Sequence, residues 1–561
     1  MVAKTTTSDA VYTLPWVVEL ILDLAGYTAD INLVDMIAVE PAAGSGSFLK
    51  GMVERLIKSC RTQKRPFMDC LSSIRAYELD SSTAECARQS VITKLLALAI
   101  PADVAGQLTR RWIREKNYLL EVGGQINRTG TAGDGSDGLL DEMQADFVIG
   151  NPPYIRLEDI PNKDNLLYRK LFHTMTGRAD IYVAFYEAAL RQLKENGVCA
   201  FICADRWMLN QYGKELRRFI TSGYSVDTII EMHQAEAFET AVDSYPAVTI
   251  IRREQQGRAI VASASPDIDQ TGAENLSWAI HQLRLNGQES IHTKRLRAYR
   301  TETWFTSADP WPCASPDRLE LLKRLERDFP LLESEDTGTR VGIGVATGAD
   351  GVYITDNPSL VEEDRLLPLA LTDDIKTGTL NWSGFYLINP WNDEGLVSLD
   401  QYPKLKRYYE TNEQRLRGRN VAKKNPKAWY KTIDRIDGSL LTKHKLYLPD
   451  IKNTIHAVLD KGETYPHHNL YFVKSRTWNL EVLGALLISD VGKFFVECYG
   501  VKMRGGYLRM QAQYLRRVRV PDIEAVSKKQ AENLEKAFRE RDVGLATKTA
   551  LEIYGIDCIP A

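Results

Sequence analysis

The residues best suited to chemistry follow an apolar run near position 150. Residues 146–154 are Asp-Phe-Val-Ile-Gly-Asn-Pro-Pro-Tyr, which places Asn151, Pro152 and Tyr154 directly after a predicted buried strand. Two consecutive prolines lack N–H donors and fix φ, so they end the strand and form a stiff loop. The Asn151 side-chain oxygen and the Pro152 carbonyl can then both accept hydrogen bonds from one amino group, and Tyr154 offers a flat stacking face. An ordinary Asn-Pro turn is the alternative, which the position after a strand disfavours.

A second motif predicts a nucleoside site. Residues 38–49, Ala-Val-Glu-Pro-Ala-Ala-Gly-Ser-Gly-Ser-Phe-Leu, run from a predicted strand through a glycine-rich turn into a predicted helix. Glycines let a ligand approach the backbone closely, and the helix N-terminus offers free N–H groups. Glu78 ends the next predicted strand, where a carboxylate can accept both ribose hydroxyls. Gly44 and Gly46 do not have the GxGxxG spacing of dinucleotide sites. A plain tight turn and a helix-capping acid remain the alternatives.

These motifs lie within residues 11–255, where predicted helices and strands alternate. Strands are expected at residues 36–39, 74–77, 147–149, 198–203, 226–230 and 247–251. This alternation predicts an α/β fold with a largely parallel sheet and helices on both faces. The glycine-rich turn then lies at the carboxyl ends of the strands, where open α/β sheets bind ligands.

Bulk properties exclude several classes of protein. The 561 residues suffice for two or more domains. No apolar run of about 18 residues and no N-terminal apolar segment is present, so we expect a cytoplasmic protein without a membrane span. The eight cysteines form no CxxC pair, which favours reduced core cysteines and predicts no metal site.

The charge is unevenly distributed along the chain. The whole sequence has a net charge of −3, yet residues 401–520 carry 24 Lys and Arg against 10 Asp and Glu. Aromatic residues are interleaved with these charges, among them Tyr408, Tyr409, Trp429, Tyr430, Tyr447, Tyr465, Tyr471, Tyr507 and Tyr514. Such a stretch suits a polyanion that carries bases, although a solvated basic face is the alternative. We expect residues 256–310 to form a linker and residues 311–561 to form a second, mixed α+β domain.

The order of the motifs resembles the γ class of N6-adenine DNA methyltransferases, which includes the Taq modification enzyme. Residues 12–15, Tyr-Thr-Leu-Pro, resemble that family's Tyr-Thr-Pro-Pro motif, and residues 40–49 resemble its Asp/Glu-Pro-Ala-Cys-Gly-x-Gly-x-Phe-Leu cofactor loop. Residues 117–119, Asn-Tyr-Leu, resemble its Asp-Phe-Leu motif. This chain departs from the pattern with Leu14 for Pro, Ala43 for Cys and Asn117 for Asp.

The resemblance implies roles for individual residues. Asn151, Pro152 and Tyr154 match the catalytic motif, and Phe238 matches the aromatic residue that stacks on the second face of the target base. The remaining matches imply an S-adenosylmethionine site formed by Tyr12, Thr13, Glu40, Pro41, Ala42, Gly44, Gly46, Phe48, Glu78, Asn117 and Tyr118. The family also implies a Rossmann-like methyltransferase domain over residues 1–255 and a DNA target-recognition domain over residues 311–561.

The implied activity is site-specific, adenine-specific methylation of double-stranded DNA in a bacterial or archaeal cell. The target adenine would be flipped out of the duplex and methylated directly, with no metal and no covalent enzyme intermediate. A cognate restriction endonuclease would act at the same site without forming a stable complex. Three alternatives remain: an RNA or protein-glutamine methyltransferase, a fused restriction-modification enzyme, and an inactive DNA-binding relative. The basic second domain disfavours an RNA or protein-glutamine methyltransferase. The motifs start at Tyr12, which disfavours a fused restriction-modification enzyme, and the intact catalytic motif disfavours an inactive relative.

Overall fold

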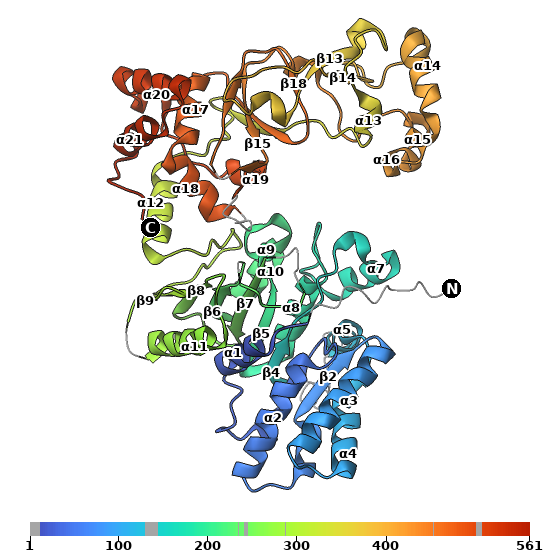
Figure 1. Ribbon diagram of the computed structural model, residues 1–561, viewed down its shortest axis with the longest axis vertical. Helices are drawn as coiled ribbons and strands as arrows, with labels where there is room; N and C mark the ends of the chain where they lie inside the picture. Colours follow the sequence, from blue (N-terminus) through green and yellow to red (C-terminus); the bar gives the residue numbers. More distant parts are fainter. Residues whose placement is uncertain are drawn as a thin grey trace. The chain divides into compact units, whose positions relative to one another are not determined.

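The computed structural model describes residues 12–129, 144–233, 235–240, 245–285, 288–452, 454–500 and 508–560. The chain divides into two compact units on either side of residue 316 (Figure 1). Each unit has a sheet and a hydrophobic core of its own. Within the described residues, no helix is both long and apolar enough to span a bilayer.

The first unit is built on a sheet that has ten strands within the described residues, in the order β3-β2-β1-β4-β5-β7-β6-β8-β10-β9. The strands that carry or flank the motifs are β1 (Ala38–Glu40), β2 (Ile74–Glu78), β3 (Ile113–Glu115), β4 (Ala145–Gly150), β5 (Leu193–Ala204), β6 (Ser225–Glu231) and β7 (Pro246–Arg252). Neighbouring strands from β3 to β5 are parallel, and β7 runs antiparallel to both β5 and β6. This confirms the predicted α/β fold. The strand order reverses between β1 and β4, which creates a crevice at their carboxyl ends.

Helices cover both faces of this sheet. They are α1 (Pro15–Ala25), α2 (Ser47–Thr62), α3 (Ser81–Ala97), α4 (Ala102–Trp112), α5 (Tyr118–Thr129), α7 (Asn162–Leu171), α8 (Tyr182–Gln192), α9 (Arg206–Leu209) and α10 (Lys214–Thr221). In β5, Ala200 belongs to one buried cluster, whereas Cys199 and Phe201 belong to the other. Since successive side chains of a strand point to opposite faces, a strand buried on both faces is a continuous apolar run.

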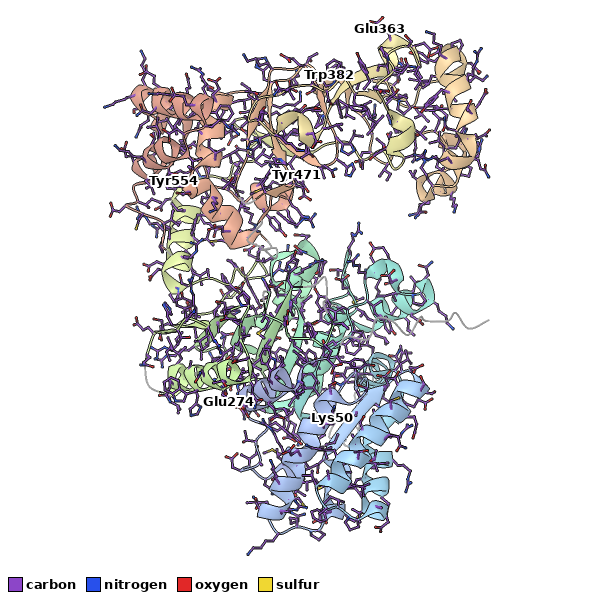
Figure 2. The ribbon with its side chains drawn as sticks, in the orientation of Figure 1. Lys50, Glu274, Glu363, Trp382, Tyr471 and Tyr554 are labelled. Atoms are coloured by element: carbon purple, nitrogen blue, oxygen red, sulfur yellow. The ribbon has the colours of Figure 1, made fainter. Side chains whose placement is uncertain are left out.

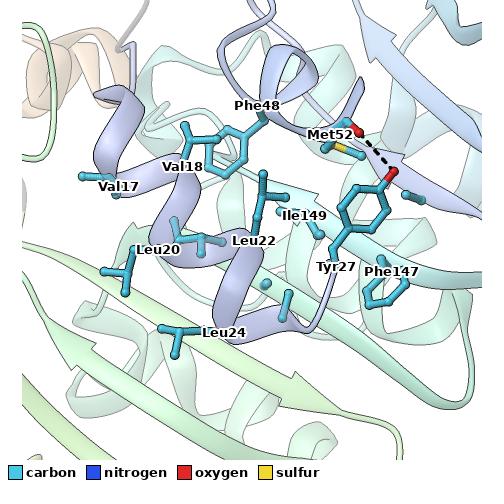
Figure 3. Packing of buried hydrophobic residues seen from close by; sticks show 14 of the residues in the cluster. Val17, Val18, Leu20, Leu22, Leu24, Tyr27, Phe48, Met52, Phe147 and Ile149 are labelled. Carbon is cyan, nitrogen blue, oxygen red and sulfur yellow. Dashed lines mark hydrogen bonds between the residues drawn. The ribbon is translucent and has the colours of Figure 1, made fainter. Parts of the chain in front are cut away.

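Helix α1 illustrates how the core is formed. Val18 and Leu22 are buried one turn apart and pack with Phe48 of α2 in the same cluster (Figure 3). Its polar positions face outward, and Glu19 forms an ion pair of 2.5 Å with Arg55 of α2. On α2 itself, Lys50 projects into solvent (Figure 2). Both helices are therefore amphipathic, with the apolar stripe against the sheet.

The prediction of a linker at residues 256–310 is wrong. This segment forms β8 (Ala259–Ala264), α11 (Gln270–Leu285), β9 (Ser290–His292) and β10 (Leu296–Thr301), and its strands extend the sheet beyond β6. Leu276, Ile280 and Leu283 are fully buried on one face of α11, spaced by four and three residues. The polar residues between these short elements obscure that periodicity in the sequence. The catalytic unit therefore extends past the predicted boundary at residue 255.

The second unit is a mixed α+β domain, as predicted. One four-stranded sheet has the order β11 (Arg340–Ile343), β19 (Leu470–Lys474), β15 (Lys445–Pro449) and β17 (Val458–Asp460). Another consists of β12 (Ile354–Thr355), β14 (Tyr386–Ile388), β13 (Leu366–Ala370) and β18 (Tyr465–Pro466). The helices used below are α13 (Asp350–Tyr353), α15 (Glu413–Arg417), α16 (Asn420–Lys424), α20 (Lys528–Glu540) and α21 (Val543–Tyr554).

Candidate active site

The two predicted motifs meet at the carboxyl ends of β1 and β4. These strands pair in register, with Val39 opposite Val148, so that Glu40 ends one strand beside Gly150 at the end of the other. A Cβ atom on Gly150 would lie 2.2 Å from Oε1 of Glu40. A side chain at position 150 would therefore displace the Glu40 carboxylate from this place. This contact between Gly150 and Glu40 was not predicted from the sequence.

The glycine-rich turn has the backbone geometry that its residues predict. Gly44 and Gly46 have φ values of +53° and +92°, in the left-handed region that favours glycine. Gly46 is the N-cap of α2 and provides no side-chain cap, so the first turn of that helix keeps amide groups for a ligand. The backbone N–H of Gly44 donates to Oε2 of Glu78 at 2.9 Å, which brings the predicted ribose acid to the turn. The other carboxylate oxygen of Glu78 accepts from the amides of Leu79 and Asp80 at 2.8 and 3.0 Å.

Glu40 is the most unusual charged group at this edge of the sheet. Only 1% of its surface is exposed, and among the described residues neither of its carboxylate oxygens has a hydrogen-bond partner. Burial raises the pKa of Glu40 well above its usual range, and the nearby Glu78 carboxylate adds to the rise. The backbone amide of Ala42 opposes this shift without a hydrogen bond of ordinary geometry. An unpaired buried carboxylate beside a glycine-rich turn suits a ligand that carries positive charge.

The catalytic motif contacts the N-terminal motif and the predicted second aromatic residue. The Asn151 side-chain amide donates to Oγ1 of Thr13 at 3.3 Å. Thr13 forms an antiparallel bridge with Phe238, flanked by backbone hydrogen bonds of 2.9–3.0 Å on either side. Three segments separated by more than 80 residues in sequence, around positions 13, 151 and 238, thus form one site.

Tyr154 and Phe238 lie next to each other but do not form an open sandwich. Their ring centroids are 6.1 Å apart and the ring planes are at 79°, an edge-to-face contact. The Tyr154 hydroxyl donates to the carbonyl of Ile202 on β5 at 3.5 Å. A flat base can enter between the two rings only if one of them turns. The two rings are therefore neighbours in a closed arrangement.

Three other predicted site residues pack in the core or cap a helix. Phe48 and Tyr118 are 4% and 2% exposed, and both belong to the hydrophobic core. Asn117 caps α5 by accepting from the amide of Leu120 at 3.1 Å, and its amide donates to the Tyr168 hydroxyl at 2.9 Å. These three side chains therefore make structural contacts within the first unit.

One polar pair at the same edge was not predicted. Asp205 follows β5 and His233 follows β6, and their side chains form a contact of 2.5 Å with 7% and 11% exposure. Glu231, the last residue of β6, brings a third donor atom within 4.8 Å of the other two. Because β5 and β6 run in the same direction, residues that follow them lie at the same edge of the sheet. A polar residue after each strand was therefore the sequence signal for this pair.

Comparisons with known protein families match both units of the chain. The Eco57I restriction-modification methylase family matches residues 73–238, and the TaqI-like C-terminal specificity domain matches residues 373–520. These matches fall in the first and the second unit respectively.

Full-length relatives are similar along the whole chain. The Type II methyltransferase M.BstVI of Geobacillus stearothermophilus is 40% identical over 531 residues, covering 94% of this chain and 92% of that protein. M.PaeR7I of Pseudomonas aeruginosa is 40% identical and M.XhoI of Xanthomonas vasicola is 38% identical, each over 98% of this chain and over 92% and 97% of the relative.

Among solved structures, the Type IIL restriction-modification enzyme MmeI in complex with DNA has a related fold. It aligns with a TM-score of 0.61 at 12% identity, over 97% of this chain and 74% of MmeI. The fold, the crevice and the full-length relatives agree, and the chain belongs to the family of Type II DNA methyltransferases of restriction-modification systems.

Proposed function

We propose that this enzyme transfers a methyl group from S-adenosylmethionine to the N6 amino group of a specific adenine in double-stranded DNA. The observation that carries the proposal is the Asn-Pro-Pro-Tyr loop at the carboxyl end of β4, beside the glycine-rich turn. The Asn151 side-chain oxygen and the Pro152 carbonyl would accept hydrogen bonds from the same amino group. These bonds would turn its lone pair out of conjugation and towards the methyl donor.

The charged and backbone groups around the glycine-rich turn suit S-adenosylmethionine. When bound, the cofactor supplies an electrophilic methyl group on a positively charged sulfur. Glu78 would accept from the ribose hydroxyls, and the buried carboxylate of Glu40 would balance positive charge on the methionine part. Tyr12, whose Cε1 atom lies 3.7 Å from the position of a Cβ atom on Gly44, would close the turn from outside. Positioning and electrostatics then account for catalysis without a covalent enzyme intermediate.

The target base would be held by the two aromatic rings. An adenine inside a duplex is not accessible, so it must be flipped into the crevice. Tyr154 and Phe238 would separate from their edge-to-face contact and stack on the two faces of the base, each contributing about 1–3 kcal/mol. Direct attack needs no strong general base, and the amino proton leaves to solvent after transfer.

A basic segment of the second unit supports duplex DNA as the substrate. Residues 413–435 carry eight Lys and Arg against two acidic residues. Lys423, Lys424 and Lys427 are exposed, and no ion pair is found for them within the described part of the chain. Arg419 anchors this segment by donating to the carbonyls of Thr347 at 3.1 Å and Trp429 at 2.8 Å. Free cations on an ordered surface are what phosphate contacts require. We further propose that a cognate endonuclease recognises the same site without a stable complex.

The test is transfer of a labelled methyl group to duplex DNA, RNA and protein, followed by mapping of the methylated base. We expect label only in duplex DNA, on N6 of adenine in one sequence context. Asn151→Ala should lower kcat by at least about 100-fold, as loss of a transition-state hydrogen bond does, while cofactor binding is retained. Asn162→Ala, at an exposed asparagine that begins α7, is the matched control and should stay active. Label on another base, or in RNA or protein, would contradict the proposal.

A further inference from the structure

Two histidines and an aspartate gather in the second unit, far from the motifs of methyl transfer in sequence. Asp350 begins α13, whereas His467 and His468 follow β18. Nε2 of His467 lies 3.2 Å from Oδ2 of Asp350, and one donor atom of each of the three side chains lies within 4.8 Å of the other two. Imidazole and carboxylate groups in this number are typical ligands of a divalent transition metal.

The backbone holds the two contributing segments together. Val345 forms a parallel bridge with His467, and the amide of His468 donates to the carbonyl of Val345 at 3.1 Å. A Cβ atom on Gly344 would lie 2.1 Å from the carbonyl oxygen of His467, so only glycine permits this approach. The donor atoms are therefore placed by the fold rather than by flexible side chains alone.

One of these side chains has an unsatisfied nitrogen. Nδ1 of His468 is buried and has no hydrogen-bond partner among the described residues, which is costly for an imidazole unless a ligand binds there. Asp350 is oriented from behind, because the Thr347 hydroxyl donates to its other oxygen, Oδ1. A carboxylate held by such an outer hydrogen bond is typical of metal sites.

We propose that Asp350, His467 and His468 bind a divalent transition-metal ion, with Zn²⁺ as the preferred occupant. Ligand atoms of a tetrahedral zinc site lie roughly 3.4 Å apart, given bonds of about 2.0–2.1 Å. The contact between His467 and Asp350 already has this spacing, and rotation of side chains brings the third donor in. Three protein ligands leave a fourth position for water. The proposal does not depend on the nature of the methylated base.

The site would connect to the basic segment 413–435. The carbonyl of Thr347, in the loop that leads from Gly344 to Asp350, accepts a hydrogen bond of 3.3 Å from the amide of Ile433. The amide of Ala346 in the same loop donates to Asp434 at 2.8 Å. A metal ion bound to Asp350 would fix this loop against the strand connection that carries the histidines. Metal binding would thereby stabilise the surface proposed to contact DNA.

The experiment is titration of the full-length, chelator-treated protein with Zn²⁺ in a calorimeter and with Co²⁺ in a visible-absorption spectrometer. We expect one high-affinity ion per chain and the absorption bands of tetrahedral cobalt. Asp350→Asn keeps the shape of a half-exposed side chain and should weaken Zn²⁺ binding at least about tenfold. His468→Ala should do the same, with circular dichroism to check that each variant is folded.

Two controls identify the site. His444→Ala removes an exposed histidine nearby in sequence and should leave Zn²⁺ binding unchanged. His233→Gln tests the Asp205–Glu231–His233 cluster of the first unit and should also leave it unchanged. The proposal is overturned if wild type and Asp350→Asn bind Zn²⁺ equally well, if neither binds it, or if only His233→Gln abolishes binding.

Discussion

At the scale of single residues, Glu40 acts against the stability of the ligand-free fold. A carboxylate that is 1% exposed and has no hydrogen-bond partner among the described residues loses its hydration without compensation. Its folded-state pKa is raised, so the folded protein holds this proton more tightly than the unfolded chain does. The associated stability is fully present below the unfolded pKa of about 4.3 and is lost as the pH rises through the folded pKa.

Glu40→Gln should therefore stabilise the cofactor-free protein, and more so at pH 8 than at pH 5. Glutamine imitates the protonated acid and is not ionised at any pH. We expect the melting temperature of the variant to exceed that of wild type by about 2 °C or more at pH 8, with a smaller difference at pH 5. Differential scanning calorimetry at both pH values measures this. The same variant should bind S-adenosylmethionine more weakly, because the counter-charge is gone. A difference in melting temperature that does not change with pH would show that Glu40 is ionised or neutral throughout.

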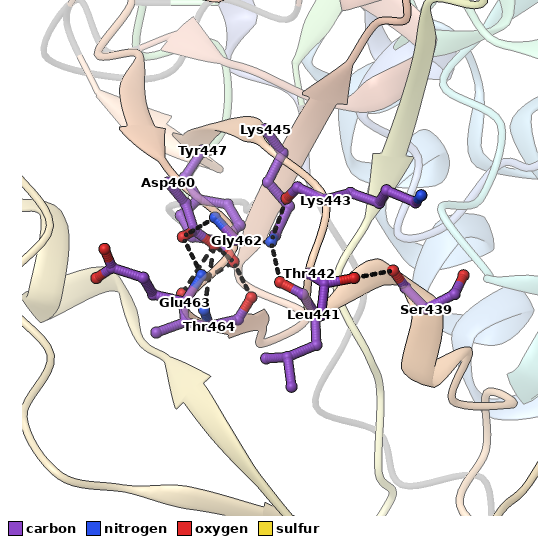
Figure 4. Close-up of polar contacts among 10 residues, drawn as sticks. All are labelled: Ser439, Leu441, Thr442, Lys443, Lys445, Tyr447, Asp460, Gly462, Glu463 and Thr464. Atoms are coloured by element: carbon purple, nitrogen blue, oxygen red, sulfur yellow. Dashed lines mark hydrogen bonds and ion pairs between the residues drawn. The ribbon is translucent and has the colours of Figure 1, made fainter.

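At the scale of elements, a buried polar network holds the β15–β17 pair of the second unit. Lys445 and Asp460 are fully buried and form an ion pair of 2.7 Å between these strands (Figure 4). Asp460 also accepts from the Tyr447 hydroxyl at 2.9 Å and from the amides of Gly462 and Glu463 at 2.9 and 2.8 Å. Every oxygen of this carboxylate is thus satisfied. Removing one partner from such a network strongly destabilises the fold, because it leaves a buried charge without compensation.

Asp460→Ala should cost about 3–5 kcal/mol of unfolding free energy, because it leaves the Lys445 ammonium buried without its counter-charge. Lys445→Met should cost less, since methionine fills the space and Asp460 keeps its hydroxyl and amide donors. Urea denaturation of the full chain, followed by circular dichroism, gives both values. Lys443→Met is the control, since the Lys443 side chain points away from the network in Figure 4. Equal costs for the two network variants would mean that the ion pair, and not the orphaned charge, dominates.

At the scale of the whole molecule, the basic stretch of the sequence lies within the second unit. Residues 401–520 are strongly basic, and the first unit is where the cofactor crevice lies. The proposed function therefore places polyanion binding and group transfer in separate units. Long-range attraction to DNA then depends on local cations rather than on the net charge of −3.

Reversing the charge of two lysines in the basic segment should show whether this segment binds DNA. Lys423→Glu combined with Lys424→Glu on α16 should weaken binding to duplex DNA and lower the slope of log affinity against log salt by about one for each phosphate that the variant no longer neutralises. Lys528→Glu combined with Lys529→Glu on α20 makes the same change in net charge at two adjacent exposed lysines. Fluorescence anisotropy over a salt series compares the two pairs. If both pairs weaken binding equally, net charge and not the basic segment controls affinity.

The sequence by itself determined the elements whose patterning is local. The strands expected at 74–77, 198–203, 226–230 and 247–251 correspond to β2, β5, β6 and β7, because strands buried on both faces are continuous apolar runs. The glycine-rich turn and the Asn-Pro-Pro-Tyr loop were also evident, since glycine permits a positive φ and proline fixes φ wherever they stand.

Only the tertiary structure decided which distant residues meet. The β8–β10 extension was missed, because its short strands are stabilised by the pairing of β8 with β6 and of β10 with β8, and not by their own sequence pattern. The contact of Gly150 with Glu40, the bridge of Thr13 with Phe238, and the approach of Asp350 to His467 each join residues more than 100 positions apart. Such contacts depend on strand register and loop path, which are set by the packing of the whole unit. A sequence pattern read over ten or twenty residues does not contain that information.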